Sequence, residues 1–402
     1  MSAKTLQKIS ASHPVCAGLL LALAPIIAAA AEAAKFLIEK VCNATAQYID
    51  VKGLMTIAAA LALLMPVFAV RAGDNQSPGS QPGEVRLLAS GLMGTIGSTI
   101  GPDGALYVAE GAVGRITRID LSTGKATTFA SGLPAAVPGV GLGGPMDVAF
   151  VGTTAYVLVA VVDSAVGGNQ RDGIYRVDDR YNSTLLVDLG TWSFNNPPDP
   201  IVPFNYFLPD GVQFALLPVA DGFLVSDGHL NRVLHVSRDG TEITVLKQFN
   251  DIVPTGLAKL GDTVFLAELG PVPQTPDTGK VVSFGLSDTH PLAPAHEVAS
   301  GVSMIVGTRF GAHGKLYALS QGIAPAGIQP GQPASPNTGR LLRVNYDGTF
   351  TILVNKLDRP ASVNFVCDTA YIVTLTGEVW EVKGVGELAD HDQKCSGCDH
   401  RD

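Results

Sequence analysis

One short motif recurs six times in this chain, at intervals of roughly fifty residues. Each copy opens on Gly or Asn and continues as a β-branched, roughly alternating run, which is the pattern of a strand that begins at a turn. The copies are Gly114–Ile119, Gly173–Val177, Asn231–Val236, Gly279–Phe284, Gly339–Val344 and Gly377–Val382. A period of this length is typical of folds built from repeated supersecondary units.

Three further strand patterns accompany the motif. A second strand precedes each copy, in the runs Ala105–Ala109, Ala155–Val159, Gly222–Val225, Thr263–Ala267, Lys315–Leu319 and Ala370–Val373. A strand upstream of these begins near Ser98, Asp147, Gly211, Gly256, Gly307 and Ser362. A fourth follows five of the copies, in the runs Ala126–Ala130, Ser183–Val187, Ile243–Lys247, His296–Ala299 and Phe350–Val354. Four strands in each of six units predict an all-β fold, a six-bladed β-propeller.

The two ends of the repeat region indicate how the ring closes. The sixth unit stops after Val382 with three strands, which would leave its outer edge unpaired. Residues Glu84–Leu92 precede the first unit and resemble the fourth strands in Phe129–Leu133 and Val298–Val302. We therefore expect the N-terminal strand to complete the last blade, since closure removes an edge that invites aggregation. The predicted propeller spans residues 84–383.

The sequence of residues 1–72 predicts a hydrophobic leader. Two apolar stretches, Pro14–Ala34 and Leu54–Val70, are followed by a polar linker at 73–83 that cannot form a core. A charge, an apolar run and a small-residue site before the linker are the parts of a secretory signal, and they predict cleavage after Ala72.

Two alternatives to cleavage stay open. The two stretches can form a membrane hairpin that tethers the domain, or translation can start near Val51, which leaves a compact signal sequence. All three versions send the domain out of the cytoplasm. We expect a secreted or periplasmic protein, with membrane tethering through an uncleaved leader as the alternative.

Composition narrows the class of partner. The chain has a net charge of −9 and no run of Lys or Arg, which argues against nucleic acid and against an anionic membrane surface. Its 45 Gly and 26 Pro among 402 residues favour many tight turns over long helices. We expect a monomer.

The tail at residues 384–402 carries two thiols and two imidazoles, at His391, Cys395, Cys398 and His400. This set is able to hold zinc, and a local disulfide or a disordered end are the alternatives. The fold does not depend on a disulfide framework.

The long connections of the predicted ring all fall on one face. They are Pro134–Pro145, Val161–Asp172, Thr191–Pro209, Pro271–Thr278 and Gly322–Thr338, whereas the other face has mostly tight turns. Long loops tend to be kept where binding occurs, so we expect a small molecule or protein partner on this face. Trp192 and Phe194 lie in an aromatic, proline-rich loop on this face. The loop is expected either to form a lid over a binding site or to pack its rings on the blade beneath.

Polar side chains are expected around the mouth of the channel. The candidate ligand-binding residues on inner strands are Asp147, Asp210, Gln213 and Arg309. Glu110, Asp227 and Asn364 offer oxygen ligands for Ca²⁺ or another divalent cation in the central channel. His229 and Glu268 are the candidate catalytic bases. The structural alternative is that these polar groups only bind the water that fills the channel.

The runs Gly101–Glu110, Gly114–Asp120 and Phe129–Leu133 resemble the ScyD/ScyE family, exported propeller proteins related in pattern to NHL-type repeats. The resemblance covers about residues 84–383, and its motifs are structural, so it implies no catalytic residues. The chain is also similar to calcium-dependent lactonases and related six-bladed hydrolases. That similarity implies a metal held by Glu, Asn and Asp, residue types that Glu110, Asn364 and Asp227 supply.

Three hypotheses of function follow. The first is an exported propeller that binds a ligand or partner on its long-loop face without turnover. The alternative is a metal-dependent hydrolase or lactonase acting on a small metabolite, and the third is an envelope scaffold. The chain has no Gly-Xaa-Ser-Xaa-Gly elbow and no P-loop, so the common motif-borne hydrolases and nucleotide enzymes are not indicated.

Overall fold

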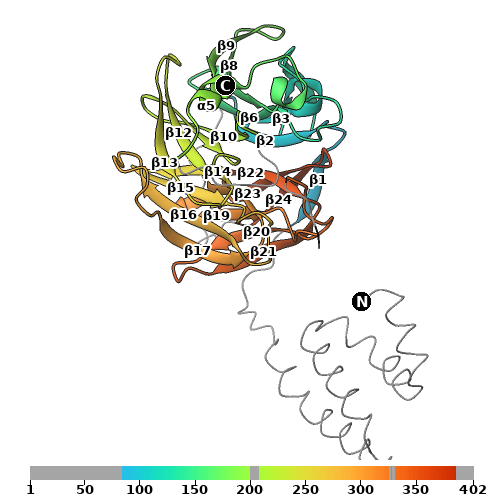
Figure 1. The fold of residues 1–402 in the computed structure, drawn as a ribbon. Coiled ribbons are helices and arrows are strands. Elements are labelled where there is room, and N and C mark those ends of the chain that lie inside the picture. The colour runs from blue at the N-terminus through green and yellow to red at the C-terminus, as the bar shows by residue number, and fades with distance from the viewer. Residues whose placement is uncertain (1–83, 200–207, 326, 328–330, 386–402) are drawn as a thin grey trace, which may run out of the picture. The chain divides into compact units, whose positions relative to one another are not determined.

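The computed structural model describes residues 84–199, 208–325, 327 and 331–385. These residues form six four-stranded antiparallel sheets arranged as the blades of a β-propeller (Figure 1). The predicted all-β class and blade number are therefore confirmed. The predicted leader, its cleavage site, the linker and residues 386–402 of the Cys/His tail lie outside the described residues, whereas Val385 of the predicted tail is buried in the core. In the part of the chain that is described, no helix has the length and hydropathy needed to cross a membrane.

The blades are numbered along the chain, and each is given from its inner to its outer strand. Blade 1 contains β2 (Thr95–Ile100), β3 (Leu106–Glu110), β4 (Arg115–Ile119) and β5 (Ala126–Ser131); blade 2 contains β6 (Gly144–Val151), β7 (Thr154–Ala160), β8 (Gly173–Val177) and β9 (Ser183–Asp188); blade 3 contains β10 (Gln213–Pro218), β11 (Gly222–Asp227), β12 (Arg232–Ser237) and β13 (Ile243–Gln248). Blade 4 contains β14 (Pro254–Leu260), β15 (Thr263–Glu268), β16 (Gly279–Gly285) and β17 (His296–Val302); blade 5 contains β18 (Ile305–Phe310), β19 (Leu316–Ser320), β20 (Gly339–Val344) and β21 (Phe350–Leu357); blade 6 contains β22 (Pro360–Val366), β23 (Thr369–Thr374), β24 (Val379–Val382) and β1 (Val85–Ala89).

The N-terminal strand closes the ring as predicted. β1 pairs antiparallel with β24, with Val85 opposite Val382. An ion pair of 2.7 Å joins Arg86 on β1 to Glu381 on β24. The inner strand β2 contacts both β6 and β22, so the first and last blades are neighbours.

The inner strands begin two or three residues away from their predicted starts, and a local irregularity explains the difference. Each inner strand has a register shift close to its first residue, for example between Thr95 and Ser98 on β2 and between Pro145 and Asp147 on β6. A bulge of this kind adds an unpaired residue and interrupts the alternation of side chains. The sequence period therefore cannot locate these strand ends.

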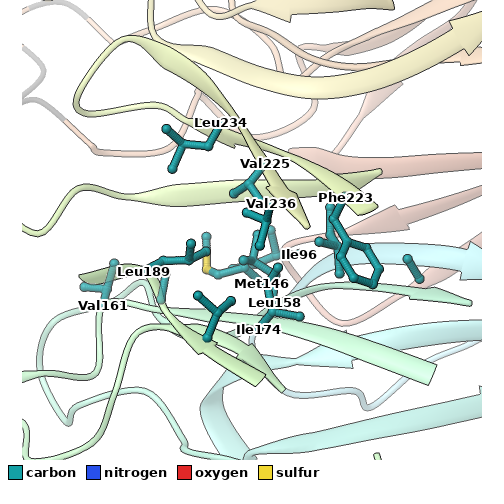
Figure 2. Close-up of a cluster of buried hydrophobic side chains, with 14 residues drawn as sticks. Ile96, Met146, Leu158, Val161, Ile174, Leu189, Phe223, Val225, Leu234 and Val236 are labelled. Carbon is teal, nitrogen blue, oxygen red and sulfur yellow. The ribbon is translucent and has the colours of Figure 1, made fainter. Parts of the chain in front are cut away.

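The hydrophobic core lies between neighbouring blades. Figure 2 shows the cluster between blades 2 and 3, where Met146 and Leu158 of blade 2 pack with Val225 and Leu234 of blade 3. All four are fully buried. Burial of one such side chain stabilises the fold by about 1.5–3 kcal/mol, so blade contacts of this kind hold the ring together.

One predicted loop contains a helix. The connection expected at Thr191–Pro209 begins with α5 (Leu189–Asn195), because the Asp188 carboxylate caps the helix by accepting a hydrogen bond of 2.8 Å from the Thr191 amide. Leu189 is buried in the cluster of Figure 2, which anchors the first turn. Three 3-10 turns complete the helical elements among the described residues, at Gly111–Val113, Ser164–Val166 and Ala312–Gly314.

Candidate functional site

The topology places two kinds of connection on one face of the ring. Because the strands of each blade are antiparallel, the loop between the second and third strands leaves the same face as the connection to the next blade. The connections at 132–143, 161–172, 269–278 and 321–338 all belong to this face, as does α5. We call it the long-loop face.

The central channel is narrow and its polar groups are paired. A cavity of about 30 Å³, room for one or two water molecules, is lined by Asp147 and Arg309. The Arg309 guanidinium donates hydrogen bonds of 3.3 Å to the Leu257 carbonyl in blade 4 and 3.4 Å to the Ser98 carbonyl in blade 1. The Asn364 amide also donates to the Ser98 carbonyl, at 3.0 Å. Three of the predicted residues, Asp147, Arg309 and Asn364, therefore meet in the channel.

Asp147 is held in this channel by the backbone. Its carboxyl oxygens accept hydrogen bonds of 2.9 Å from the amides of Val148 and Leu216. Burial raises the pKa of Asp147 to about 6, and the charge of Arg309 opposes this rise. A side chain at Gly97 would collide with Asp147 Oδ1, so the neighbouring blade must present a glycine there.

Three of the predicted acids occupy the same place in their blades. Glu110, Asp227 and Glu268 are the last residues of the second strands β3, β11 and β15. Each lies opposite a basic residue near the start of the third strand, and these partners are Arg115, Arg232 and Lys280 respectively. The separations are 2.8 Å for the Glu110 pair and 3.7 Å for the Asp227 pair. Glu110 and Asp227 are therefore partners of these bases across their own hairpins, whereas Lys280 forms its ion pair of 2.6 Å with Glu297.

Glu110 has no oxygen left for a metal. Its carboxylate accepts hydrogen bonds from the Met93 amide at 2.8 Å, from the Arg115 guanidinium and from the Thr117 hydroxyl. Glu110 is fully buried among these donors.

The contacts do not bring the three predicted metal ligands together. The contacts of Glu110 lie in and around blade 1, Asn364 bonds Ser98 in the channel, and Asp227 bonds residues of blade 3. Within the described ranges, no group of three or more His, Cys, Asp or Glu residues is arranged to hold a metal ion. The residues present therefore do not fit a cation shared by Glu110, Asp227 and Asn364.

Asp227 organises the rim of blade 3. Its Oδ1 accepts hydrogen bonds of 3.0 and 3.1 Å from the amides of Val212 and Leu230. Gln213 is its cross-strand neighbour and donates 2.9 Å to the carbonyl of Asp210. Gln213, Asp227 and Asp210, all predicted binding residues, are thus brought to one rim.

His229 and Glu268 are separated from each other. Nε2 of His229 accepts a hydrogen bond of 2.6 Å from the Leu208 amide, and burial lowers the pKa of the imidazole. This contact holds His229 as a neutral acceptor at the rim of blade 3. Glu268 is buried at the end of β15 in blade 4, where burial raises its pKa to about 7.

Four carboxyl groups gather around the first turn of α5, and we call them the carboxyl cluster: Asp163, Asp172, Asp188 and Asp210. The carboxyl group of Asp163 is a neighbour of that of Asp210. Burial, followed by the neighbouring Asp163 side chain, raises the pKa of Asp210 to about 7. Burial also raises the pKa of Asp172 to about 7. Two carboxyl groups of the cluster therefore hold protons near neutral pH.

The predicted aromatic residues lie next to this cluster. Trp192 is half-buried on α5, whereas the side chain of Phe194 is 60% exposed. Sequence reasoning selected Asp210 and missed Asp163, Asp172 and Asp188. Their positions in the sequence could have indicated them. Asp163 and Asp172 lie in the predicted long loop Val161–Asp172, and Asp188 directly precedes α5.

Comparison with solved structures shows the fold. A gluconolactonase from Xanthomonas campestris is similar with a TM-score of 0.53 and 12% identity, over 77% of this chain and 93% of that one. The calcium-binding protein regucalcin from Agrobacterium tumefaciens has a TM-score of 0.50 and 14% identity, over 76% and 96%. The PQQ-bound aldose sugar dehydrogenase from Streptomyces coelicolor has a TM-score of 0.50 and 14% identity, over 76% and 99%.

No protein-family model matches the chain, and no curated protein matches it. At 12–14% identity these similarities concern the backbone alone. The chain therefore shares its six-bladed β-propeller fold with gluconolactonase-like proteins.

Proposed function

We propose that this propeller is a hydrolase of a small metabolite of the lactone or ester class, acting at the carboxyl cluster on its long-loop face. The observation that carries the proposal is the pair of neighbouring carboxyl groups Asp163 and Asp210, in which burial and the nearby Asp163 raise the pKa of Asp210 to about 7. Both residues are partly exposed, so a ligand is able to reach them. A carboxyl group with a pKa near the working pH is an efficient general acid or base.

The two members of the pair have different roles. The Asp163 carboxyl group accepts a hydrogen bond of 3.0 Å from the Ala165 amide, which orients it. Asp210, whose pKa is raised to about 7, carries the proton. In the proposed reaction Asp163 removes a proton from a water molecule that attacks the carbonyl carbon, and Asp210 gives its proton to the oxygen of the breaking C–O bond. Proton exchange between the two carboxyls restores the starting state.

The similarity to a gluconolactonase supports the lactone class at the level of the fold. No step is routed through a metal, because the residues predicted to hold one are engaged elsewhere. Export, a monomeric state and membership of the ScyD/ScyE family are also proposals. They are supported by the apolar stretches before residue 73 and by the repeat motif.

The test is lactone hydrolysis by the full chain at pH 6–8, with a panel of aldonolactones as substrates. We expect Asp210→Asn and Asp163→Asn each to lower kcat/KM by about 10²–10⁴-fold. Asp239→Asn is the matched control, because Asp239 lies in an exposed turn on the opposite face. A wild-type protein that hydrolyses no member of the panel, or an Asp210→Asn variant with full activity, would contradict the proposal.

A second candidate is binding without turnover. The exposed ring of Phe194 next to the carboxyl cluster favours it, because an aromatic side chain offers contact area at low entropy cost. Calorimetry with the same aldonolactones and with aldonic acids separates the two functions. Binding that is weakened in Phe194→Ala, together with absence of hydrolysis, would leave a binding protein.

A further inference from the structure

We propose that Arg232 is a positioning residue for the carboxyl cluster, because it holds the C-terminal end of α5 while the first turn of α5 packs against Asp163 and Asp172. This inference rests on the proposed function, since it assigns a role at the same site. Arg232 belongs to blade 3, whereas most residues of the carboxyl cluster belong to blade 2.

Arg232 contacts the end of α5 in two ways. Its Nη1 donates a hydrogen bond of 2.7 Å to the carbonyl of Asn196, the residue that caps the helix. Its guanidinium carbon lies 5.1 Å from the centre of the Trp192 ring. The Arg232 side chain is only 1% exposed, so both contacts are shielded from water. A cation–π contact is stronger when it is shielded from water than when it is exposed.

The other end of α5 forms a wall of the carboxyl cluster. The amides of Leu189 and Gly190 donate hydrogen bonds of 2.9 and 3.1 Å to the Asp172 carbonyl. A Cβ added at Gly190 would lie 3.0 Å from the Cβ of Asp172 and 3.4 Å from Asp163 Oδ2. The glycine therefore lets the helix approach both side chains closely and shield Asp172, which is 2% exposed, from water.

A helix of seven residues is too short to be stable by itself. The position of its first turn therefore depends on contacts at both of its ends. Arg232 is the charged contact at the C-terminal end, so its loss should let water reach the carboxyl cluster. Hydration favours the ionised form of a carboxyl group.

Among the described residues, further charged and titratable groups face the carboxyl cluster. Besides its four carboxyls they are Arg171, which forms an ion pair of 3.3 Å with Asp188, and Tyr175, whose hydroxyl bonds the Arg171 carbonyl. His229 lies close by, through the Leu208 amide. None of these groups touches Arg232 in the contacts described above, but its partner Asp227 lies beside Gly211 and Gln213 on the rim that includes Asp210. The single variant Asp227→Asn therefore separates an effect carried by Asp227 from one carried by α5.

Two readouts test the inference. The chain has two tryptophans, so Trp380→Phe leaves Trp192 as the single emitter. In this background Arg232 is replaced by Met together with Asp227→Asn, which avoids a buried unpaired carboxylate. We expect a red shift of the Trp192 emission and, by carbon NMR of the carboxyl groups, a titration midpoint of Asp210 lowered by about one pH unit.

The matched control is Arg238→Met in the same background. Arg238 also stacks on a ring, 5.0 Å from the centre of Phe223, and it donates to the Val219 carbonyl away from α5. It should move neither readout. An unchanged Asp210 midpoint in a folded double variant would overturn the inference even if the emission shifts, since Arg232 would then support only the ring.

A third variant covers failure of the double variant to fold. Trp192→Leu removes the stacked ring without burying a charge, and the Asp210 midpoint should fall in the same direction. An unchanged midpoint there overturns the inference as well. Full lactone hydrolysis by Asp210→Asn would instead contradict the proposed function and leave the midpoint result intact.

Discussion

The carboxylate of Asp227 lies 3.7 Å from the guanidinium of Arg232, and neither side chain is more than 1% exposed. Glu110 and Arg115 repeat this arrangement in blade 1 at 2.8 Å. In each case the acid ends the second strand and the base begins the third. A buried charge needs a partner, so the hairpin itself accounts for these carboxylates without any ligand.

Glu110→Ala should destabilise the protein by about 3–5 kcal/mol, because it leaves the Arg115 guanidinium and the Met93 amide without their acceptor. Denaturant unfolding measures the change. Asp103→Ala is the control, since its ion pair with Arg118 is exposed and contributes about 1 kcal/mol or less. Equal effects of the two substitutions would refute the structural role of Glu110.

Chelation should leave the thermal midpoint unchanged. The cation that lines the channel is the guanidinium of Arg309, and the oxygens of Glu110 are held by Arg115 and Thr117. An ion bound only by the folded state would raise the midpoint, so EDTA would lower it. Stoichiometric calcium whose removal lowers the midpoint would contradict this expectation and restore the metal site predicted from the sequence.

Stability should fall as the pH rises from about 4 to 7. Burial raises the pKa of Asp147 to about 6 and of Asp172 to about 7. A carboxyl group with a raised pKa in the folded state stabilises it fully below the unfolded value of about 4, and this contribution is lost as the pH rises through the folded value.

Exposed carboxylates lower the stability of the protein in acid. Hydrogen bonds from Ser237 and Thr241 lower the pKa of Asp239 to about 2, so its contribution is lost in acid. We expect the thermal midpoint to be highest near about pH 4. Differential scanning calorimetry across pH 3–9 measures it, and a midpoint that is highest above pH 7 would show that the buried carboxyls titrate normally.

Glu268→Gln should stabilise the protein at high pH. Glu268 is 5% exposed, and burial raises its pKa to about 7. At pH 8 the folded protein must hold this carboxylate ionised, so a neutral isostere should add about 2 kcal/mol, whereas at pH 5 it should change little. Unfolding at the two pH values gives the difference. A stabilisation of the same size at both would exclude ionisation as its cause.

The repeated strands could be predicted because each blade uses the same order of turn residue and β-branched run. The copies at Gly279 and Gly339 start at the residues where β16 and β20 begin. The pairing of Glu110 with Arg115 was also within reach, since a charged residue follows the turn glycine directly. The metal set was chosen by residue type alone, and residue type does not show which hydrogen bonds a carboxylate already accepts.

The carboxyl cluster was harder to predict. Asp163 and Asp210 are 47 positions apart and lie in loops of different blades, so only the ring brings them together. Most of α5 lies in the expected loop Thr191–Pro209, and its seven residues include Gly, Thr and Trp, which are poor helix formers. Its cap at Asp188 and the burial of Leu189 override that preference.

Removal of β1 should destabilise the whole ring. Without residues 84–90 the outer strand of blade 6 is missing. This exposes the edge of β24, and the core loses the buried side chain of Leu88. An open edge strand pairs readily with other chains, so we expect a lower thermal midpoint and concentration-dependent aggregation, measured by light scattering. Arg86→Ala is the control, because it removes the ion pair with Glu381 and keeps the strand. A shortened chain that remains monomeric and as stable as the intact one would show that three strands suffice for blade 6.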